Sequence, residues 1–128
     1  MSYQKLTRVI VRLKEKTDEG KIEWEATAND NIFIASFPDQ SIRIEKVNQS
    51  SIHDGFLAAV TATKYVITIL DSAGKEIEST NDAQMTNQIQ NSTYFFMTLF
   101  NAAKRYACGI DSALDKLLNA LGDDDIPF

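Results

Sequence analysis

The sequence predicts a small α+β domain: an N-terminal helix, an antiparallel β-meander of three to four strands, and two C-terminal helices packed on one sheet face. Apolar residues recur at helical spacing near the N-terminus and again from about residue 83 onward. Between these segments lie short runs rich in β-branched and aromatic residues, separated by turn signals. Because 128 residues suffice for one buried core, we expect a single domain over residues 1–121 and a flexible acidic docking tail over residues 122–128.

The first helix is predicted over residues 3–17. Apolar residues recur at the spacing that places them on one helical face, which we expect to face a core, namely Leu6, Val9, Ile10 and Leu13. The β-branched run at residues 9–11 argues for a strand, yet the spacing favours a helix. On that helix, four basic side chains would share a narrow face beside the apolar stripe, namely Lys5, Arg8, Arg12 and Lys16.

The meander is predicted between residues 21 and 79. Alternation and turn residues indicate strands near residues 32–37, 41–47, 65–70 and 76–79. Residues 21–27 also alternate and are either a short edge strand or an extended arm, and we expect Trp24 to anchor the core. Residues 48–62 are expected to be irregular or an insertion, because they open with Asn-Gln-Ser-Ser and contain His53-Asp54-Gly55. Within them, residues 56–60 are a candidate start for the next strand.

Two helices are predicted after the meander. The first starts near Asp82 and ends at Gly109. The second opens with Asp111 as its cap and has leucines at helical spacing, namely Leu114, Leu117, Leu118 and Leu121. Most phenylalanines are core candidates, including Phe33, Phe37, Phe95, Phe96 and Phe100. Residues 94–107 contain more phenylalanine than a small sheet would cover, which hints at a homodimer.

Composition limits the class of protein. The net charge is −5, but three of the eighteen acids are Asp123, Asp124 and Asp125. Without them, fifteen acids face thirteen bases, so the body has no overall basic signature for nucleic acid. A single cysteine rules out an internal disulfide and suits a reducing cytoplasm. Because we find neither an apolar leader nor a run long enough to span a membrane, we expect a cytoplasmic protein.

Nothing in the sequence indicates an enzyme. The only histidine, His53, falls in a predicted loop, and Cys108 falls on an apolar helix face where we expect a small buried hydrophobe. Neither a phosphate-binding glycine loop nor metal-ligand spacing is present. We therefore predict no catalytic residue, no metal and no cofactor.

The basic stripe of Lys5, Arg8, Arg12 and Lys16 has three interpretations. In the first interpretation, the stripe contacts the phosphate backbone of a nucleic acid. Alternatively, it holds the acidic tail of its own chain and shields it until a partner competes. It is also consistent with an ordinary solvated face, because Glu15 and Glu19 are near it in the sequence.

The final six residues have the composition of a docking peptide: Asp123, Asp124, Asp125, Ile126, Pro127 and Phe128. The ring of Phe128 suits a small pocket, and its α-carboxylate suits a basic residue beside that pocket. Pro127 lowers the entropy lost on binding, and Ile126 adds a second apolar contact. The three aspartates would speed encounter with a basic rim.

This hexapeptide resembles the C-terminal tip of the bacterial single-stranded DNA-binding protein. The resemblance implies that its partners are genome-maintenance enzymes with a pocket for that tip, such as a replication-restart helicase, exonuclease I, recombination mediators and a clamp-loader subunit. The body resembles small uncharacterised bacterial or phage α+β proteins at residues 19–25, 65–67, 71–75 and 107–111. That second resemblance implies the element order but no activity.

Two hypotheses follow from the sequence. In the first, a non-enzymatic bacterial or phage protein uses its tip to recruit or inhibit enzymes of DNA replication, repair or recombination. In the second, the body itself binds single-stranded DNA through the basic helix face, although the five-strand barrel pattern usual for that role is missing.

Overall fold

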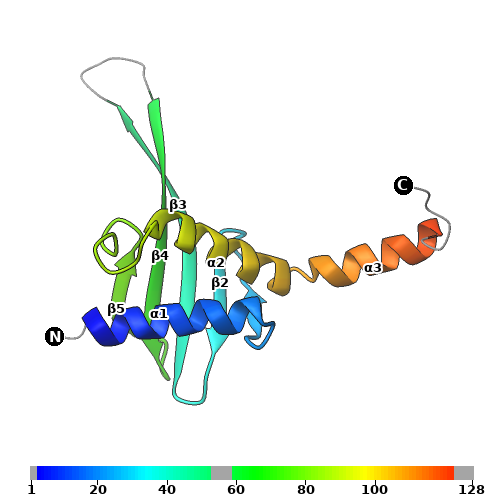
Figure 1. Cartoon of the computed structure of the whole chain (residues 1–128), viewed down its shortest axis with the longest axis horizontal. Helices are drawn as coiled ribbons and strands as arrows, with labels where there is room; N and C mark the ends of the chain where they lie inside the picture. Colours follow the sequence, from blue (N-terminus) through cyan, green and yellow to red (C-terminus); the bar gives the residue numbers. More distant parts are fainter. Residues whose placement is uncertain (1–2, 53–58, 123–128) are drawn as a thin grey trace.

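The computed structural model of the protein describes residues 3–52 and 59–122. It confirms the predicted α+β class, with one helix before an antiparallel sheet and two helices after it (Figure 1). The helices are α1 (Tyr3–Asp18), α2 (Ser92–Ala107) and α3 (Ile110–Leu121). The strands are β1 (Trp24–Ala26), β2 (Ile32–Ser36), β3 (Gln40–Ile52), β4 (Ala59–Asp71) and β5 (Glu76–Asn81).

The sheet has five strands in the order of the sequence, β1-β2-β3-β4-β5, rather than three to four. The additional strand is β1, which pairs antiparallel with β2 and places Trp24 opposite Ala35. Trp24 is buried as predicted, and its indole N–H donates to the hydroxyl of Thr17 on α1 at 3.1 Å. The edge strand is therefore attached to the helix layer as well as to the sheet.

The prediction of an irregular region at residues 48–62 is wrong for its described residues, whereas the alternative that a strand begins within residues 56–60 agrees with the start of β4 at Ala59. The pairing of β3 with β4 runs unbroken from Gln40↔Asp71 to Ile52↔Ala59. Asn48 lies opposite Thr63, whose hydroxyl donates to the Asn48 side chain at 3.2 Å. Cross-strand pairing overrides the weak strand propensity of Asn and Ser here. Figure 1 shows this hairpin extending past the helices, and its predicted loop residue His53 lies outside the described residues.

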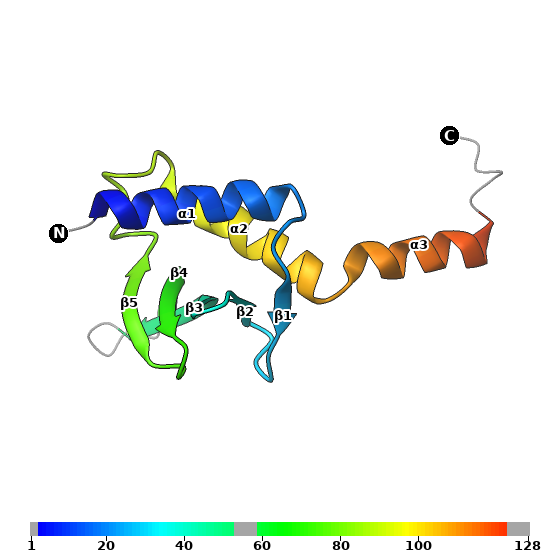
Figure 2. The same ribbon diagram turned by 90° about the horizontal axis from the view of Figure 1, so that it is seen from below.

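The core lies between one face of the sheet and the layer formed by α1 and α2 (Figure 2). Strand register places Phe33, Ile44 and Ile67 side by side on that face, and all three are buried. Ile10 and Leu13 enter from α1 and Leu6 packs against the core, which confirms these positions of the predicted apolar stripe. The prediction is wrong for Val9, which is 42% exposed. Phe96 and Phe100 enter from α2, and the Phe100 ring lies 5.5 Å from that of Phe33.

α2 begins at Ser92 and not near Asp82, because residues 83–91 form turns. Asp82 has a different role, since its buried carboxylate accepts the Tyr65 backbone N–H at 3.1 Å and the Thr93 hydroxyl at 2.8 Å. The Ser92 hydroxyl donates to the Asp82 backbone carbonyl at 2.8 Å. Burial, together with the Asp82 charge, raises the pKa of the Tyr65 phenol above its usual value.

α3 differs from the other helices because it leaves the body. Among the described elements it contacts only α2, so the predicted packing on the sheet holds for α2, while α3 extends outward beyond it (Figures 1 and 2). None of its described residues is buried, and its apolar stripe is exposed: Leu114 is 46%, Leu117 55%, Leu118 37% and Leu121 79% exposed. Gly109 is its N-cap, with Asp111 in the first turn.

Two other predictions in this region are wrong for related reasons. Cys108 is exposed, because α2 ends beside it and the chain turns away from the core. The phenylalanines of α2 do not form an uncovered apolar surface, because Phe96 and Phe100 are in the core and Phe95 lies under the ammonium of Lys14. The argument for a homodimer from uncovered phenylalanines of α2 therefore fails, while the homodimer itself stays a prediction. The exposed leucines lie on α3 instead.

Candidate functional site

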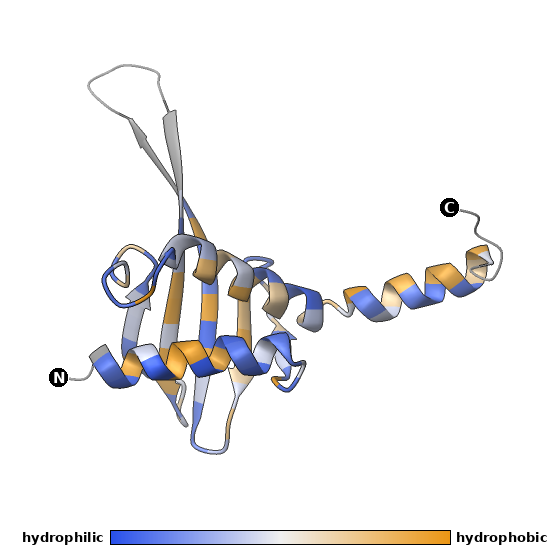
Figure 3. Cartoon of the chain, viewed as in Figure 1, coloured by the Kyte–Doolittle hydropathy of each residue, from blue (hydrophilic) through white to orange (hydrophobic). Residues whose placement is uncertain are grey.

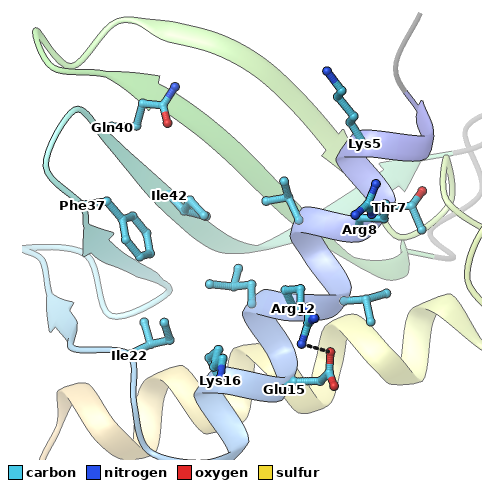
Figure 4. Close-up of a pocket in the computed structure, with 13 residues that line it drawn as sticks. Lys5, Thr7, Arg8, Arg12, Glu15, Lys16, Ile22, Phe37, Gln40 and Ile42 are labelled. Carbon is cyan, nitrogen blue, oxygen red and sulfur yellow. Dashed lines mark ion pairs between the residues drawn. The ribbon is translucent and has the colours of Figure 1, made fainter.

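A groove of about 740 Å³ runs between α1 and the turn that joins β2 to β3 (Figure 4). We call it the α1 groove. Helix α1 contributes most of its lining, and the sheet side contributes the rest. The lining residues are Lys5, Thr7, Arg8, Val9, Val11, Arg12, Leu13, Glu15, Lys16, Ile22, Phe37, Gln40 and Ile42.

All four residues of the predicted basic stripe line this groove, namely Lys5, Arg8, Arg12 and Lys16. Their spacing of three and four residues places them along one side of α1, while Leu13 on the adjoining face enters the core. The sequence thus predicted which bases lie together. It did not predict that apolar residues from β3 and from the connections beside β1 and β2 lie opposite them.

Carboxylates only partly neutralise these bases. Arg12 lies 3.9 Å from Glu15, and Lys16 lies 3.7 Å from Glu19, both at the long end of ion-pair distances. Glu19 is closer to Lys21, at 3.1 Å, and a hydrogen bond from Lys21 followed by the charge of Lys16 lowers its pKa. Within residues 3–52 and 59–122, Lys5 and Arg8 form no ion pair. Two of the four cations are therefore unneutralised.

The apolar side of the groove includes Phe37, which was predicted to be a core residue but is 40% exposed. The alternation of Phe33 and Ala35 points Phe37 to the helix-covered side, but β2 ends at Ser36 and Phe37 already belongs to the turn. Its backbone N–H donates to the Gln40 carbonyl at 2.8 Å. Figure 4 shows its ring facing the groove, across from α1. On the helix side, Val9 is 42% exposed.

The other predicted site, Asp123 to Phe128, lies outside the described residues. Gly122, the last described residue, caps the far end of α3. We call α3 and the residues that follow it, residues 110–128, the C-terminal arm. An ion pair of 2.5 Å between Arg105 of α2 and Asp111 of α3 bridges the junction between body and arm.

The described parts of the chain bear on chemistry in two further respects. Within them, no three side chains of His, Cys, Asp or Glu gather as a metal site would require. No described helix combines the length and the apolarity needed to cross a membrane. That the protein is not an enzyme stays a prediction.

Comparison with protein families, with curated proteins and with solved structures finds no match to this chain. Both resemblances drawn from the sequence therefore stay predictions. Inference about function rests on the α1 groove, the C-terminal arm and the sequence of the tip.

Proposed function

We propose that this is a non-enzymatic, cytoplasmic adaptor of bacterial or phage DNA replication, repair or recombination. Its tip, Asp123–Phe128, docks onto enzymes that recognise the tail of the single-stranded DNA-binding protein. The observation that supports this most is the sequence of the tip, three aspartates followed by Ile-Pro-Phe. Its place in the chain supports it further, because the preceding helix contacts the body only through α2 among the described elements.

The position of α3 suits such a role. Twelve helical residues rise about 18 Å, so Gly122 lies well away from the α2 junction. An enzyme that encloses the ring of Phe128 would then meet little obstruction from the sheet and its two covering helices. Affinity would come from Phe128 and Ile126, and the aspartates would mainly raise the association rate at low salt. So short an epitope implies a dissociation constant on the order of micromolar.

Calorimetric titration of the full chain against purified exonuclease I tests the proposal. Deleting Phe128, or adding one glycine after it, should weaken binding at least tenfold, because the first removes the ring and the second displaces the carboxylate. Asp115→Asn is the matched control, since it alters one charge on α3 and leaves the tip intact. Unchanged affinity of the Phe128 deletion, for this enzyme and for the helicase and clamp-loader subunit, would reject tip docking.

A second candidate function is single-stranded DNA binding in the α1 groove. The observation in its favour is that the half-exposed ring of Phe37 lines the same groove as Arg8 and Arg12, because unstacked bases bind to aromatic rings in positively charged grooves. Fluorescence anisotropy with a labelled oligonucleotide in low salt tests it. Binding should weaken in Phe37→Ala and in the double variant Arg8→Glu, Arg12→Glu. An absence of binding by the unmodified chain at low salt rejects this function.

A further inference from the structure

We propose that the chain self-associates by placing the C-terminal arm of one copy in the α1 groove of a second copy. Each copy has a helix α3 whose leucines are exposed and a groove lined by apolar and basic side chains, as far as residues 3–52 and 59–122 show. The proposal does not depend on the tip docking onto enzymes. It assigns a partner to the leucines of α3 and to the α1 groove, which tip docking leaves unused.

The apolar face of α3 is exposed to solvent and would gain stability by packing against another surface. One face of α3 is an exposed apolar stripe that consists of Leu114, Leu117, Leu118 and Leu121. In Figure 3, apolar and polar colours alternate along this projecting helix, as expected for an amphipathic helix. A twelve-residue helix is marginally stable alone in water, and most helices gain their stability by burying such a stripe. Within the described residues the only element that α3 contacts is α2, and that contact buries none of the leucines.

The groove offers the matching apolar surface. Val9 and Phe37 are 42% and 40% exposed on its two sides, and Ile22 and Ile42 also line it. It follows the length of α1 from Lys5 to Lys16, which is a span suited to another helix lying alongside. Leucines at positions i, i+3, i+4 and i+7 match the way in which an amphipathic helix fills such a groove.

Charge favours the pairing as well. The arm contains five aspartates and one lysine, a net charge of −4. The groove contains four bases and one acid, Glu15, a net charge of +3. Lys5 and Arg8 have no ion-pair partner in the described chain, and those of Arg12 and Lys16 are distant. The aspartates would therefore meet cations that the chain does not itself neutralise.

Helix α3 of the same copy does not lie in the groove, since among the described elements it contacts only α2. The ion pair between Arg105 and Asp111 bridges the junction, and α3 continues outward from the end of α2 rather than back along α1 (Figure 1). A second copy satisfies both surfaces without moving this junction. When two copies exchange arms reciprocally, the result is a closed dimer with two equivalent contacts.

Sedimentation velocity on the purified full chain in low salt tests the proposal over a range of concentrations. We expect a dimer that dissociates as salt is added. The arm variant (Leu117→Asp, Leu121→Asp) and the groove variant (Arg8→Glu, Arg12→Glu) should each raise the dissociation constant at least tenfold. All four residues are exposed, so circular dichroism should show both variants folded. The control variant Lys75→Glu, Lys104→Glu reverses two exposed charges outside the groove and should still dimerise.

Mixing the two variants gives the decisive measurement. The groove variant retains an intact arm and the arm variant an intact groove, so an equimolar mixture should regain one contact and associate. Three results would overturn the proposal: a monomeric unmodified chain at low salt, a dimer insensitive to the groove variant, or a mixture that stays monomeric. Loss of oligonucleotide binding in the groove variant of a monomeric chain would instead assign the groove to nucleic acid. None of these measurements involves an enzyme, so they are independent of tip docking.

Discussion

Helices α2 and α3 are neighbours in the chain, and both have an apolar stripe, yet they differ in what covers that stripe. In α2, Phe96, Leu99 and Phe100 are at most 2% exposed, whereas the exposed fractions on α3 reach 79% at Leu121. Burying one such side chain contributes about 1.5–3 kcal/mol, so α2 stabilises the fold and α3 leaves a comparable free energy unused. An amphipathic pattern therefore identifies which face of a helix needs a cover, and it does not identify which molecule provides the cover.

The largest expected effect is a loss of stability when a buried side chain of α2 is removed. Phe100→Ala should lower the free energy of unfolding by about 3–5 kcal/mol, because it opens a cavity between the rings of Phe33 and Tyr65. Urea unfolding followed by the fluorescence of Trp24 measures the change. Tyr94→Ala lies on the same helix but is 65% exposed, and it should change stability by less than about 0.5 kcal/mol. Similar losses in the two variants would contradict the core that we describe.

The next effect concerns the connection that leads into α2. Asp82→Ala should cost about 2–3 kcal/mol, because the Tyr65 N–H and the Thr93 hydroxyl lose a buried charged acceptor. Asp82→Asn keeps one oxygen acceptor, so its free energy of unfolding should fall less than that of the alanine variant. Thr93→Val removes only one donor and should lower the free energy of unfolding least. A different order of the three in urea unfolding would mean that the carboxylate is not what holds this turn to β4.

A smaller effect should appear at high pH. The pKa of Tyr65 is raised in the folded chain, so the unfolded phenol loses its proton first, near pH 10. The folded state then binds more protons than the unfolded state, and stability falls as the pH rises through this range. Relative to Tyr65→Phe, the unmodified chain should lose stability as the pH rises above about 10, the ordinary pKa of the phenol. Tyr94→Phe is the control for an exposed phenol, and a pH-independent difference at Tyr65 would contradict the shift.

The smallest effect on stability is expected on α3. In high salt and dilute solution, where the arm is free, Leu117→Ala should change the free energy of unfolding by less than about 0.5 kcal/mol. The same exposure predicts early cleavage in limited trypsin digestion, because local opening of α3 requires little free energy. Mass spectrometry should detect cutting after Lys116 well before cutting after Lys14, which is partly buried on α1. Simultaneous cleavage at both sites would mean that the arm is as well protected as the body.

Much of the fold could be predicted from the sequence because local patterns agreed with tertiary packing. The stripe containing Ile10 and Leu13 does face the core, and Trp24 does anchor it. Prediction failed where packing or pairing decides the outcome. Asn48 and its polar neighbours continue a strand because β4 pairs with them. Phe37 has the inward phase of its strand, but it lies one residue beyond the end of that strand.

The candidate site was predictable to a similar extent. Helical spacing alone placed Lys5, Arg8, Arg12 and Lys16 on one face, and they do line one groove. The opposite side of the groove was not predictable, because Phe37 and Ile42 reach it only through the three-dimensional path of the sheet. The exposure of the α3 leucines was not predictable either, since nothing local distinguishes a helix that returns to the sheet from one that leaves it.

Cys108 gives the junction between α2 and α3 a practical use. It is the only thiol in the chain, it is exposed, and it lies immediately before Gly109, where the chain turns into α3 with a φ of 61°. A maleimide spin label would attach at this residue alone and report the rotational freedom of the junction on the nanosecond timescale. Distances between the labels of two associated copies would then give the geometry of the assembly without any further substitution.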